Sequence, residues 1–447
     1  MKKKMFVVMG FLLVALIVGL VCIHIRNKND VVRFGVIADT HVVESDSAGR
    51  IKEALETFKE ISPDIDGVLM CGDIVYQYPV EGSVSVSVSD VMYDYVLDVY
   101  KDSMGEDVPF VWAVGNHEYP QHTVDAQLSA EALRFFVDKT GQETNCSTTI
   151  AGISVITAAA KDYYGSLSQE TETWLMEEIK KAAEKSKKPI FLMLHHPIQG
   201  TVLNIKTASC SKEFKSFLKQ YPQVINLTAH AHYPAQNPNT ISQDGFTAIQ
   251  VPYLGVNGYL SAVGESYVQD IYQALMIEID YKNMVKVYKI DVGSGEYIGE
   301  PWEIDIPKLL KNDASAYHYT DARIENSSKP YFEKGVELLI KNITNSSARF
   351  SFRNAKNEAQ NEYVQDDFVA YYKVQVSECN SDIVVNEQIL NSGFYLSTDP
   401  PSKMPMIVEG RIDGLIKGVK YNVTIIPVSP FGIEGDILVS EFVTTNE

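Results

Sequence analysis

Five short apolar runs within the first 232 residues each end in side chains that can bind a metal ion. They are residues 31–38 before Asp39 and His41, 68–71 before Asp73, 111–115 before Asn116 and His117, 190–194 before His195 and His196, and 224–228 before His230 and His232. Apolar runs of this length, bounded by turn residues, are typical of buried β-strands. Loops that leave the carboxyl ends of strands in an open α/β sheet converge at one edge. The pattern therefore predicts an α/β fold in which five strands direct their polar ends at one place.

Helical patterns separate these strands along the chain. They cover residues 50–61, 90–103, 125–139, 169–185 and 212–219, and Ser168 is the expected N-cap of the fourth. Further strands are predicted at 247–254, 272–280 and 284–292. The strictly alternating SVSVSVS at 83–89 predicts an edge strand or a loop hairpin at the rim of the site. Strands that first alternate with helices and then run as hairpins predict two mixed β-sheets with helices outside.

The character of the sequence changes at about Asp321, where helical patterns end and short alternating runs are separated by Asn and Ser turns. Six or seven short strands in about 120 residues are typical of a β-sandwich. The spacing of Leu415, Gly418 and Tyr421 resembles the tyrosine corner of fibronectin type III domains, in which the phenol bonds upstream backbone. The buried tryptophan common in those domains has no counterpart, because all three tryptophans precede residue 303. We expect a site-bearing domain over 31–310 and a fibronectin type III-like β-sandwich over 321–447.

Residues 5–25 form an apolar run with three lysines before it and Arg26 and Lys28 after it. A run of about 20 apolar residues matches the thickness of a bilayer core and exceeds the core of a usual signal peptide. Residues 1–30 are therefore predicted to be an uncleaved membrane anchor, with the lysines inside and the rest of the chain on the extracytoplasmic face. A cleaved signal peptide, which would leave a secreted protein, is the alternative.

Composition limits the classes of partner. The 447 residues carry a formal net charge of −19, which argues against electrostatic capture of nucleic acid and requires a locally positive site for any anionic substrate. The five cysteines form no CxxC pair, so no thiolate metal site is expected and Cys71 is predicted to be a small core residue. The oligomeric state stays open.

The donors that end the five runs are two carboxylates, one amide oxygen and four imidazoles. Mixed nitrogen and oxygen donors suit first-row transition metal ions. Seven donors exceed what one tetrahedral ion needs, but they fit two ions that share one ligand, and a bridging carboxylate makes Asp73 the natural shared ligand. Asp39 and His41 are two residues apart, as are His230 and His232, so each pair can serve the site only if the backbone turns between its members.

Two such ions against two carboxylates and a bridging hydroxide leave about one positive charge, which attracts a phosphate. Metal binding lowers the pKa of water, so a metal-bridging hydroxide could attack phosphorus in line. The leaving oxygen then needs a proton, and His117, beside Asn116, is the candidate donor. The alternative is that His117 only orients other residues.

In order, the motifs D-x-H, G-D, G-N-H-E, H-H-P and x-H-x-H resemble the calcineurin-like metallophosphoesterase family, which includes purple acid phosphatases and class III cyclic nucleotide phosphodiesterases. The resemblance covers about residues 33–292 and implies an αββα fold with two ions, the pair being drawn from Mn, Fe and Zn. By resemblance, one ion is held by Asp39, His41, Asp73 and His232, and the other by Asp73, Asn116, His195 and His230. His196 would lie behind the ligands or face the substrate.

Two positions depart from the family pattern. Ala229 replaces the usual Gly before the last histidine pair, which predicts a negative φ or mild strain there. Tyr76 matches the tyrosine that binds iron in purple acid phosphatases, but His41 stands where those enzymes have Gly. Tyr76 is therefore not expected to bind a metal, and an iron charge-transfer site is not expected.

The sequence thus predicts an extracytoplasmic, dinuclear-metal-dependent phosphoesterase that acts on phosphate mono- or diesters, as small molecules or on a surface. The alternative is a cell-surface binding protein, in which the β-sandwich recognises a partner and the metal domain is vestigial. The complete set of donors favours the enzyme.

Overall fold

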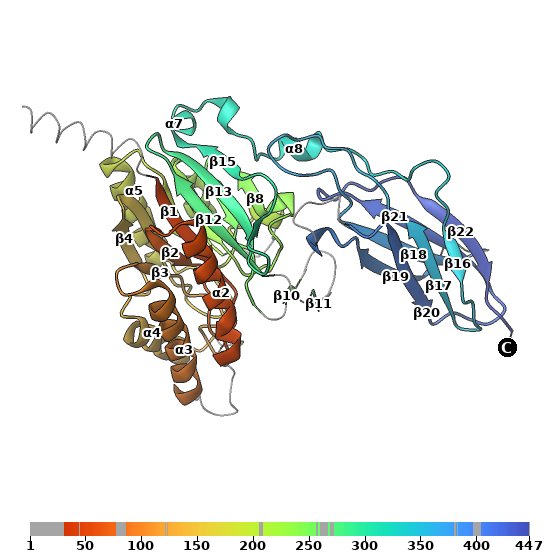
Figure 1. Cartoon of the computed structure of the whole chain (residues 1–447), viewed down its shortest axis with the longest axis horizontal. Coiled ribbons are helices and arrows are strands. Elements are labelled where there is room, and N and C mark those ends of the chain that lie inside the picture. The colour runs from red at the N-terminus through yellow and green to blue at the C-terminus, as the bar shows by residue number, and fades with distance from the viewer. Residues whose placement is uncertain are drawn as a thin grey trace, which may run out of the picture.

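The computed structural model of the chain consists of two bodies, the N-terminal body (β1 to α8) and the C-terminal body (β16 to β22) (Figure 1). It describes residues 31–43, 45–76, 86–120, 122, 124–204, 209–255, 258–259, 267–268, 272–379, 381, 383–396 and 404–446. The anchor predicted at residues 5–25 lies outside these ranges. Within them, no helix combines the length and the apolar character that crossing a bilayer requires.

Two mixed β-sheets face each other in the N-terminal body. The first has the order β14-β13-β12-β1-β2-β3, with β15 also paired to β13, and the second has the order β4-β5-β6-β7-β9-β8. The strands of the first sheet are β1 (Val32–Ile37), β2 (Gly67–Met70), β3 (Phe110–Trp112), β12 (Gln273–Ile279), β13 (Met284–Asp291), β14 (Glu296–Tyr297) and β15 (Trp302–Asp305). Those of the second are β4 (Cys146–Ile150), β5 (Ile153–Thr157), β6 (Ile190–Met193), β7 (Val224–Thr228), β8 (Ile241–Gln243) and β9 (Thr247–Gln250). A separate pair joins β10 (Gly258–Tyr259) to β11 (Tyr267–Val268).

Helices cover the outer face of each sheet. The elements are α2 (Ser45–Ile61), α3 (Val86–Met104) and α4 (Ala126–Thr140) on the first sheet, α5 (Gln169–Lys185) and α6 (Lys212–Leu218) on the second, and the short α7 (Ile306–Leu309) and α8 (Ala322–Glu325). The central strands are apolar on both faces because both faces are covered. In β1, for example, Phe34 packs between the sheets and Ile37 packs against the helices. The prediction of two mixed sheets with helices outside is confirmed.

The alternating segment 83–89 was interpreted wrongly. Residues 86–89 form the first turn of α3, and 83–85 lie outside the described residues. Four alternating residues do not distinguish a strand from one helical turn. The buried positions Tyr93, Val96 and Tyr100, spaced three and four residues apart, place the segment on a helix instead. The other predicted helices are present, and Ser168 caps α5 by accepting a hydrogen bond from Thr171 N–H at 3.1 Å.

The C-terminal body is all-β, as predicted. Its strands are β16 (Leu339–Lys341), β17 (Ser347–Arg353), β18 (Tyr371–Glu378), β19 (Val384–Asn391), β20 (Ile407–Asp413), β21 (Lys420–Val428) and β22 (Leu438–Val443). They form the sheets β16-β17-β20 and β19-β18-β21-β22, which enclose one apolar core. Ile416 N–H donates a hydrogen bond to the Tyr421 hydroxyl at 2.9 Å, the contact expected of a tyrosine corner.

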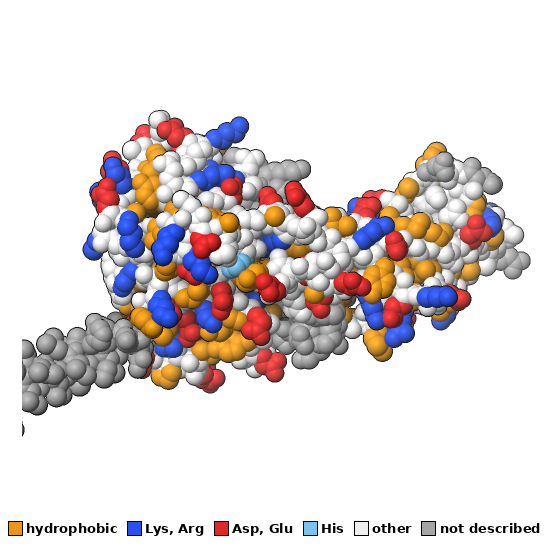
Figure 2. Space-filling model, turned by 90° about the horizontal axis from the view of Figure 1, so that it is seen from above, with side chains coloured by type: hydrophobic (Ala, Val, Ile, Leu, Met, Phe, Trp, Pro, Cys, Tyr) orange, Lys and Arg blue, Asp and Glu red, His pale blue; other side chains and the backbone are white. Residues whose placement is uncertain are grey.

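Several contacts join the two bodies. Asn239 donates from Nδ2 to the Pro430 carbonyl at 2.6 Å, and the Arg323 guanidinium lies 5.6 Å from the centre of the Phe431 ring. Val364 packs into the core between the two sheets of the N-terminal body. On the face shown in Figure 2, acidic and basic side chains are interspersed over both bodies. The C-terminal body is therefore fixed against the N-terminal body by packed side chains.

Candidate metal centre

The polar residues that follow the five strands converge between the two sheets. Asp39 follows β1, Asp73 follows β2, Asn116 follows β3, His195 follows β6, and the pair His230 and His232 follows β7. β1, β2 and β3 are parallel in one sheet, and β6 and β7 are parallel in the other. Their carboxyl ends therefore open on the same side of the body, as the sequence predicts.

The backbone turns sharply at most of these residues. Asp39, His41, Asp73, His230 and His232 have φ values of 53°, 48°, 51°, 70° and 51°. L-residues rarely adopt this left-handed region, which costs roughly 1 kcal/mol or more per residue. Hydrogen bonds between the loops stabilise this left-handed conformation. Asp39 N–H donates to the Gly72 carbonyl and His41 N–H to the Asp73 carbonyl, each at 3.0 Å. Ala229 is not among the positive-φ residues, so the loop turns after it instead.

The turned loops bring all seven predicted donors together in two groups. The first comprises Asp39, His41, Asp73 and His232, and the second comprises Asp73, His195 and His230. Within each group one potential ligand atom per residue lies within 4.8 Å of the others. Asn116 joins the second group, since its Oδ1 lies 2.8 Å from His230 Nδ1 and 3.1 Å from His195 Nε2. Asp73 is common to both groups.

The nitrogen and oxygen atoms of these side chains are arranged as ligands of metal ions would be. His195 Nδ1 lies 2.9 Å from the Cys71 carbonyl, which can only accept, so Nδ1 carries a proton and Nε2 is the nitrogen that faces the site. Asp73 Oδ2 lies 3.0 Å from that Nε2, yet it has no hydrogen-bond partner among the described residues. His41 Nε2 and His232 Nε2 lie 3.1 Å apart. Buried nitrogen and oxygen atoms this close together, on side chains that can all act as metal ligands, fit bound metal ions.

The electrostatics point the same way. Burial lowers the pKa of His41 to about 3 and that of His230 to about 4, so both imidazoles are neutral and can donate lone pairs. Burial would also lower the pKa of His195, but the carboxylates of Asp73 and Asp39 raise it to about 9. Burial would raise the pKa of Asp73, but His195 and His117 hold it well below its ordinary value. The buried carboxylates thus attract positive charge, which metal ions would supply.

Removing the cations should destabilise the fold. A ligand that binds only the native state at 100 times its dissociation constant stabilises it by about 2.7 kcal/mol, so chelation should lower the Tm by roughly 5–10 °C. Thermal unfolding with and without a chelator measures this, and adding back Zn²⁺ or Mn²⁺ should restore the Tm. An unchanged Tm in protein shown by elemental analysis to be metal-free would contradict the assignment.

His117 lies beside the two groups. Its backbone N–H donates to Asp73 Oδ1 at 2.7 Å, and its Nε2 is 4.0 Å from Asp73 Oδ2. The side chain is 14% exposed, and burial lowers its pKa. His196 packs its ring 4.2 Å from that of His230, and burial lowers the pKa of His196 well below the ordinary value. His117 is therefore accessible at the site without belonging to either donor group.

The wall beside His232 is built by aromatic side chains. Tyr253 stacks on His232 with ring centres 5.7 Å apart and an interplanar angle of 29°. Burial raises the pKa of Tyr253, and nearby Tyr395 adds to this shift.

Glu118 is the functional residue that sequence reasoning missed. Its Oε2 accepts hydrogen bonds from Gly115 N–H at 2.6 Å and Asp73 N–H at 2.9 Å, and its Oε1 accepts from Ile74 N–H at 2.8 Å. Burial, and then the nearby Asp73, raise the pKa of Glu118 to about 7. Glu118 therefore ties the Asp73 loop to the Asn116 loop. The available signal was a carboxylate in G-N-H-E directly after a buried apolar strand, where an unpaired charge would be costly.

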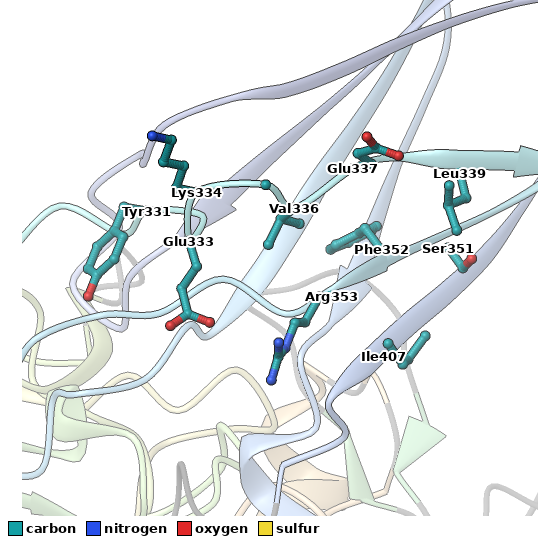
Figure 3. Close-up of a pocket in the computed structure, with 11 residues that line it drawn as sticks. Tyr331, Glu333, Lys334, Val336, Glu337, Leu339, Ser351, Phe352, Arg353 and Ile407 are labelled. Atoms are coloured by element: carbon teal, nitrogen blue, oxygen red, sulfur yellow. The ribbon is translucent and has the colours of Figure 1, made fainter.

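A groove of about 690 Å³ lies on the C-terminal body, lined by Leu339 and Ile407 among others (Figure 3). Glu333 and Arg353 bring both signs of charge to it. Its lining residues include no histidine, aspartate or cysteine, so it offers no second set of metal ligands. In the part of the chain that the structure describes, both groups of potential metal ligands lie at the site between the two sheets instead.

Three solved structures show similarity to parts of this chain. A purple acid phosphatase from yellow lupin (Lupinus luteus) has 13% identity and a TM-score of 0.47, over 64% of this chain and 56% of that one. The chain thus spans about half the length of the lupin enzyme. GAP50, the anchor in the inner membrane complex of Plasmodium, has 12% identity and a TM-score of 0.39, over 64% of this chain and 95% of that one. The fn3 domain of human collagen alpha-1(XX) chain has 12% identity and a TM-score of 0.18, over 26% of this chain and 84% of that one.

Comparison of sequences finds a family match in the N-terminal body. A search of curated proteins gives no match. The family model described as calcineurin-like phosphoesterase matches residues 32–234, which contain all seven donors. Residues 32–234 are therefore similar to the calcineurin-like phosphoesterase family, and both groups of potential metal ligands lie within the matched residues.

Proposed function

We propose that the chain hydrolyses phosphate mono- or diesters with two metal ions, Mn, Fe or Zn. The observation that carries this proposal is the pair of donor groups that share Asp73. Asp39, His41, Asp73 and His232 would hold one ion, and Asp73, Asn116, His195 and His230 the other. Such ions supply a nucleophilic water near neutral pH and positive charge for the phosphoryl oxygens. The local positive charge reconciles an anionic substrate with a chain of net charge −19.

The chain's own residues hold and deliver the remaining protons. His195 keeps its Nε2 toward the site because its Nδ1–H is bonded to the Cys71 carbonyl. His117, which lies next to Asp73 and remains partly exposed, donates a proton to the leaving oxygen of the ester. Because its ring belongs to neither donor group, its proton is free for this transfer.

Activity of the full chain against a panel of phosphate monoesters and diesters tests this function. The protein is loaded in turn with Mn²⁺, Fe²⁺ or Zn²⁺ and assayed on aryl and alkyl esters of both kinds. We expect hydrolysis that depends on the metal and disappears with a chelator. Inertness of protein that holds two ions per chain would contradict the proposal and favour a binding role for the C-terminal body.

His117→Ala should separate metal binding from proton transfer. We expect the variant to retain both ions and to lose about 10²- to 10⁴-fold in kcat, the usual contribution of a general acid. The loss should be largest for alkyl esters, whose leaving group is strongly basic. Elemental analysis and steady-state kinetics measure the two effects. Loss of the ions would make His117 part of the metal site, and an unchanged kcat would remove it from the reaction.

The location and the C-terminal body belong to the proposal as well. The apolar residues 5–25 support an anchored protein with its site on the extracytoplasmic face. The hydrogen bond from Ile416 to Tyr421 supports a fibronectin type III-like C-terminal body. Labelling intact cells with a membrane-impermeant lysine reagent tests the location, because labelling that required lysis would place the site inside.

A further inference from the structure

The His117 imidazole is enclosed by aromatic rings. The ring of Tyr76 stacks on it, with centres 4.2 Å apart and an interplanar angle of 21°. His41 meets it edge-on at 4.8 Å and 77°, and Tyr163 meets it edge-on at 5.9 Å and 85°. Three neighbouring rings therefore restrict the positions that this imidazole can take.

Within the described residues, no hydrogen bond fixes the same ring. His117 Nδ1 is buried and has no hydrogen-bond partner among the described residues. The 4.0 Å between Nε2 and Asp73 Oδ2 is too long for a hydrogen bond. The bond from His117 N–H to Asp73 Oδ1 fixes the backbone but leaves the side-chain torsions free. The orientation of the imidazole therefore depends on ring packing.

Tyr76 is itself held firmly to the metal-site loops. Tyr76 N–H donates to the Val42 carbonyl at 3.1 Å, and Val42 forms a parallel bridge with Val75. Val75 N–H donates to Glu118 Oε1 at 3.3 Å. The Tyr76 ring also lies 5.6 Å from the ring of His41. Tyr76 is thus fixed to the same loops that position the donors, and its stacked ring can restrict the orientation of the His117 imidazole.

We propose that Tyr76 is a positioning residue for proton transfer, whose stacked ring holds the His117 imidazole toward the leaving oxygen while Tyr163 packs edge-on against the same imidazole. This inference rests on the proposed role of His117. The ring face is what the contact requires, so phenylalanine at position 76 should serve and an aliphatic residue should not. A tyrosine that bound metal through its hydroxyl would show the reverse dependence.

The test compares Tyr76→Leu and Tyr76→Phe on two substrates, a 4-nitrophenyl phosphoester and the phenyl phosphoester of the same class. The 4-nitrophenolate leaves without protonation, whereas the more basic phenolate needs the proton. Misplacing the donor in Tyr76→Leu should lower kcat for the phenyl ester by about 10- to 100-fold, with little change for the 4-nitrophenyl ester. Tyr76→Phe should restore most of that rate. The exposed Tyr281→Leu is the matched control and should behave as the unaltered protein.

Two further measurements address the mechanism of the loss. Elemental analysis should find both ions retained in Tyr76→Leu. In the zinc-loaded protein, NMR of selectively labelled histidine should show the His117 ring protons shifted by the stacked ring, and this shift should vanish in Tyr76→Leu but persist in Tyr76→Phe.

A double-mutant cycle decides whether Tyr76 acts through His117. In a His117→Ala background, Tyr76→Leu should cause no further loss, because the group that it positions is gone. An equal loss in both backgrounds, or a Tyr76→Phe variant as slow as Tyr76→Leu, would overturn the inference. Full activity of His117→Ala alone would instead refute the proposed role of His117, so the two failures are distinguishable.

Discussion

Asp73→Asn should lose both metal ions and the phosphoesterase activity together. Asp73 is the one residue common to the two donor groups, so removing its charge weakens both at once. Asparagine has the same shape and tolerates the left-handed φ of 51° at this position, so the change isolates the carboxylate charge from the backbone geometry. We expect kcat/KM to fall by at least about 10⁴-fold, which corresponds to about 5.5 kcal/mol of transition-state stabilisation.

Elemental analysis and kinetics on the same preparation check this result. The matched control is Asp436→Asn, which removes a surface carboxylate that is 65% exposed and paired with Lys329 at 3.0 Å. Such an exposed pair contributes little, so the control should keep its ions, its rate and its Tm. An Asp73→Asn variant that kept two ions per chain would show that the groups do not share this ligand.

The donors could be predicted because the evidence for them is local in the sequence. Each donor directly follows an apolar run, and the requirement for a turn between Asp39 and His41 follows from their spacing alone. The structure meets this requirement with positive φ values at both residues. The order of the motifs and the chemistry of the side chains were enough to predict which residues form the two donor groups. Neither depends on knowing how the two sheets pack.

Contacts that depend on packing could not be predicted in the same way. Glu118 bonds to the N–H groups of residues 73–75, more than 40 positions earlier, and no local pattern in the sequence indicates which distant backbone this carboxylate reaches. The stacking of Tyr76 on His117 likewise exists only because two loops meet. The prediction of a strand or hairpin at residues 86–89 was wrong for a related reason. The alternation of these residues is a local pattern, but the helix α3 that they begin is stabilised by packing against the first sheet.

The hydrogen bonds of Glu118 to the two loops lead to a second prediction with a large effect, on both stability and metal affinity. In Glu118→Gln, an NH₂ group replaces one oxygen and faces backbone N–H donors, so at least one pair of hydrogen bonds is lost. Hydrogen bonds to a charged group contribute about 1.5–3 kcal/mol each, so the variant should lose roughly 3–5 kcal/mol of unfolding free energy. Because two of the lost or weakened bonds hold Asp73 and Gly115, the donors should also shift and metal affinity should fall by about 10- to 100-fold.

Chemical denaturation and metal titration separate these two consequences when Glu172→Gln serves as the control. Glu172 is also a buried carboxylate, with bonds from Ser211 N–H at 2.6 Å and the Ser211 hydroxyl at 2.5 Å, but it belongs to α5 on the outer face of the second sheet. Its loss should cost stability without changing metal affinity. If both variants lost stability while neither lost affinity, Glu118 would be a general support of the fold. If only Glu118→Gln lost affinity, its carboxylate sets the geometry in which Asp73 serves both groups.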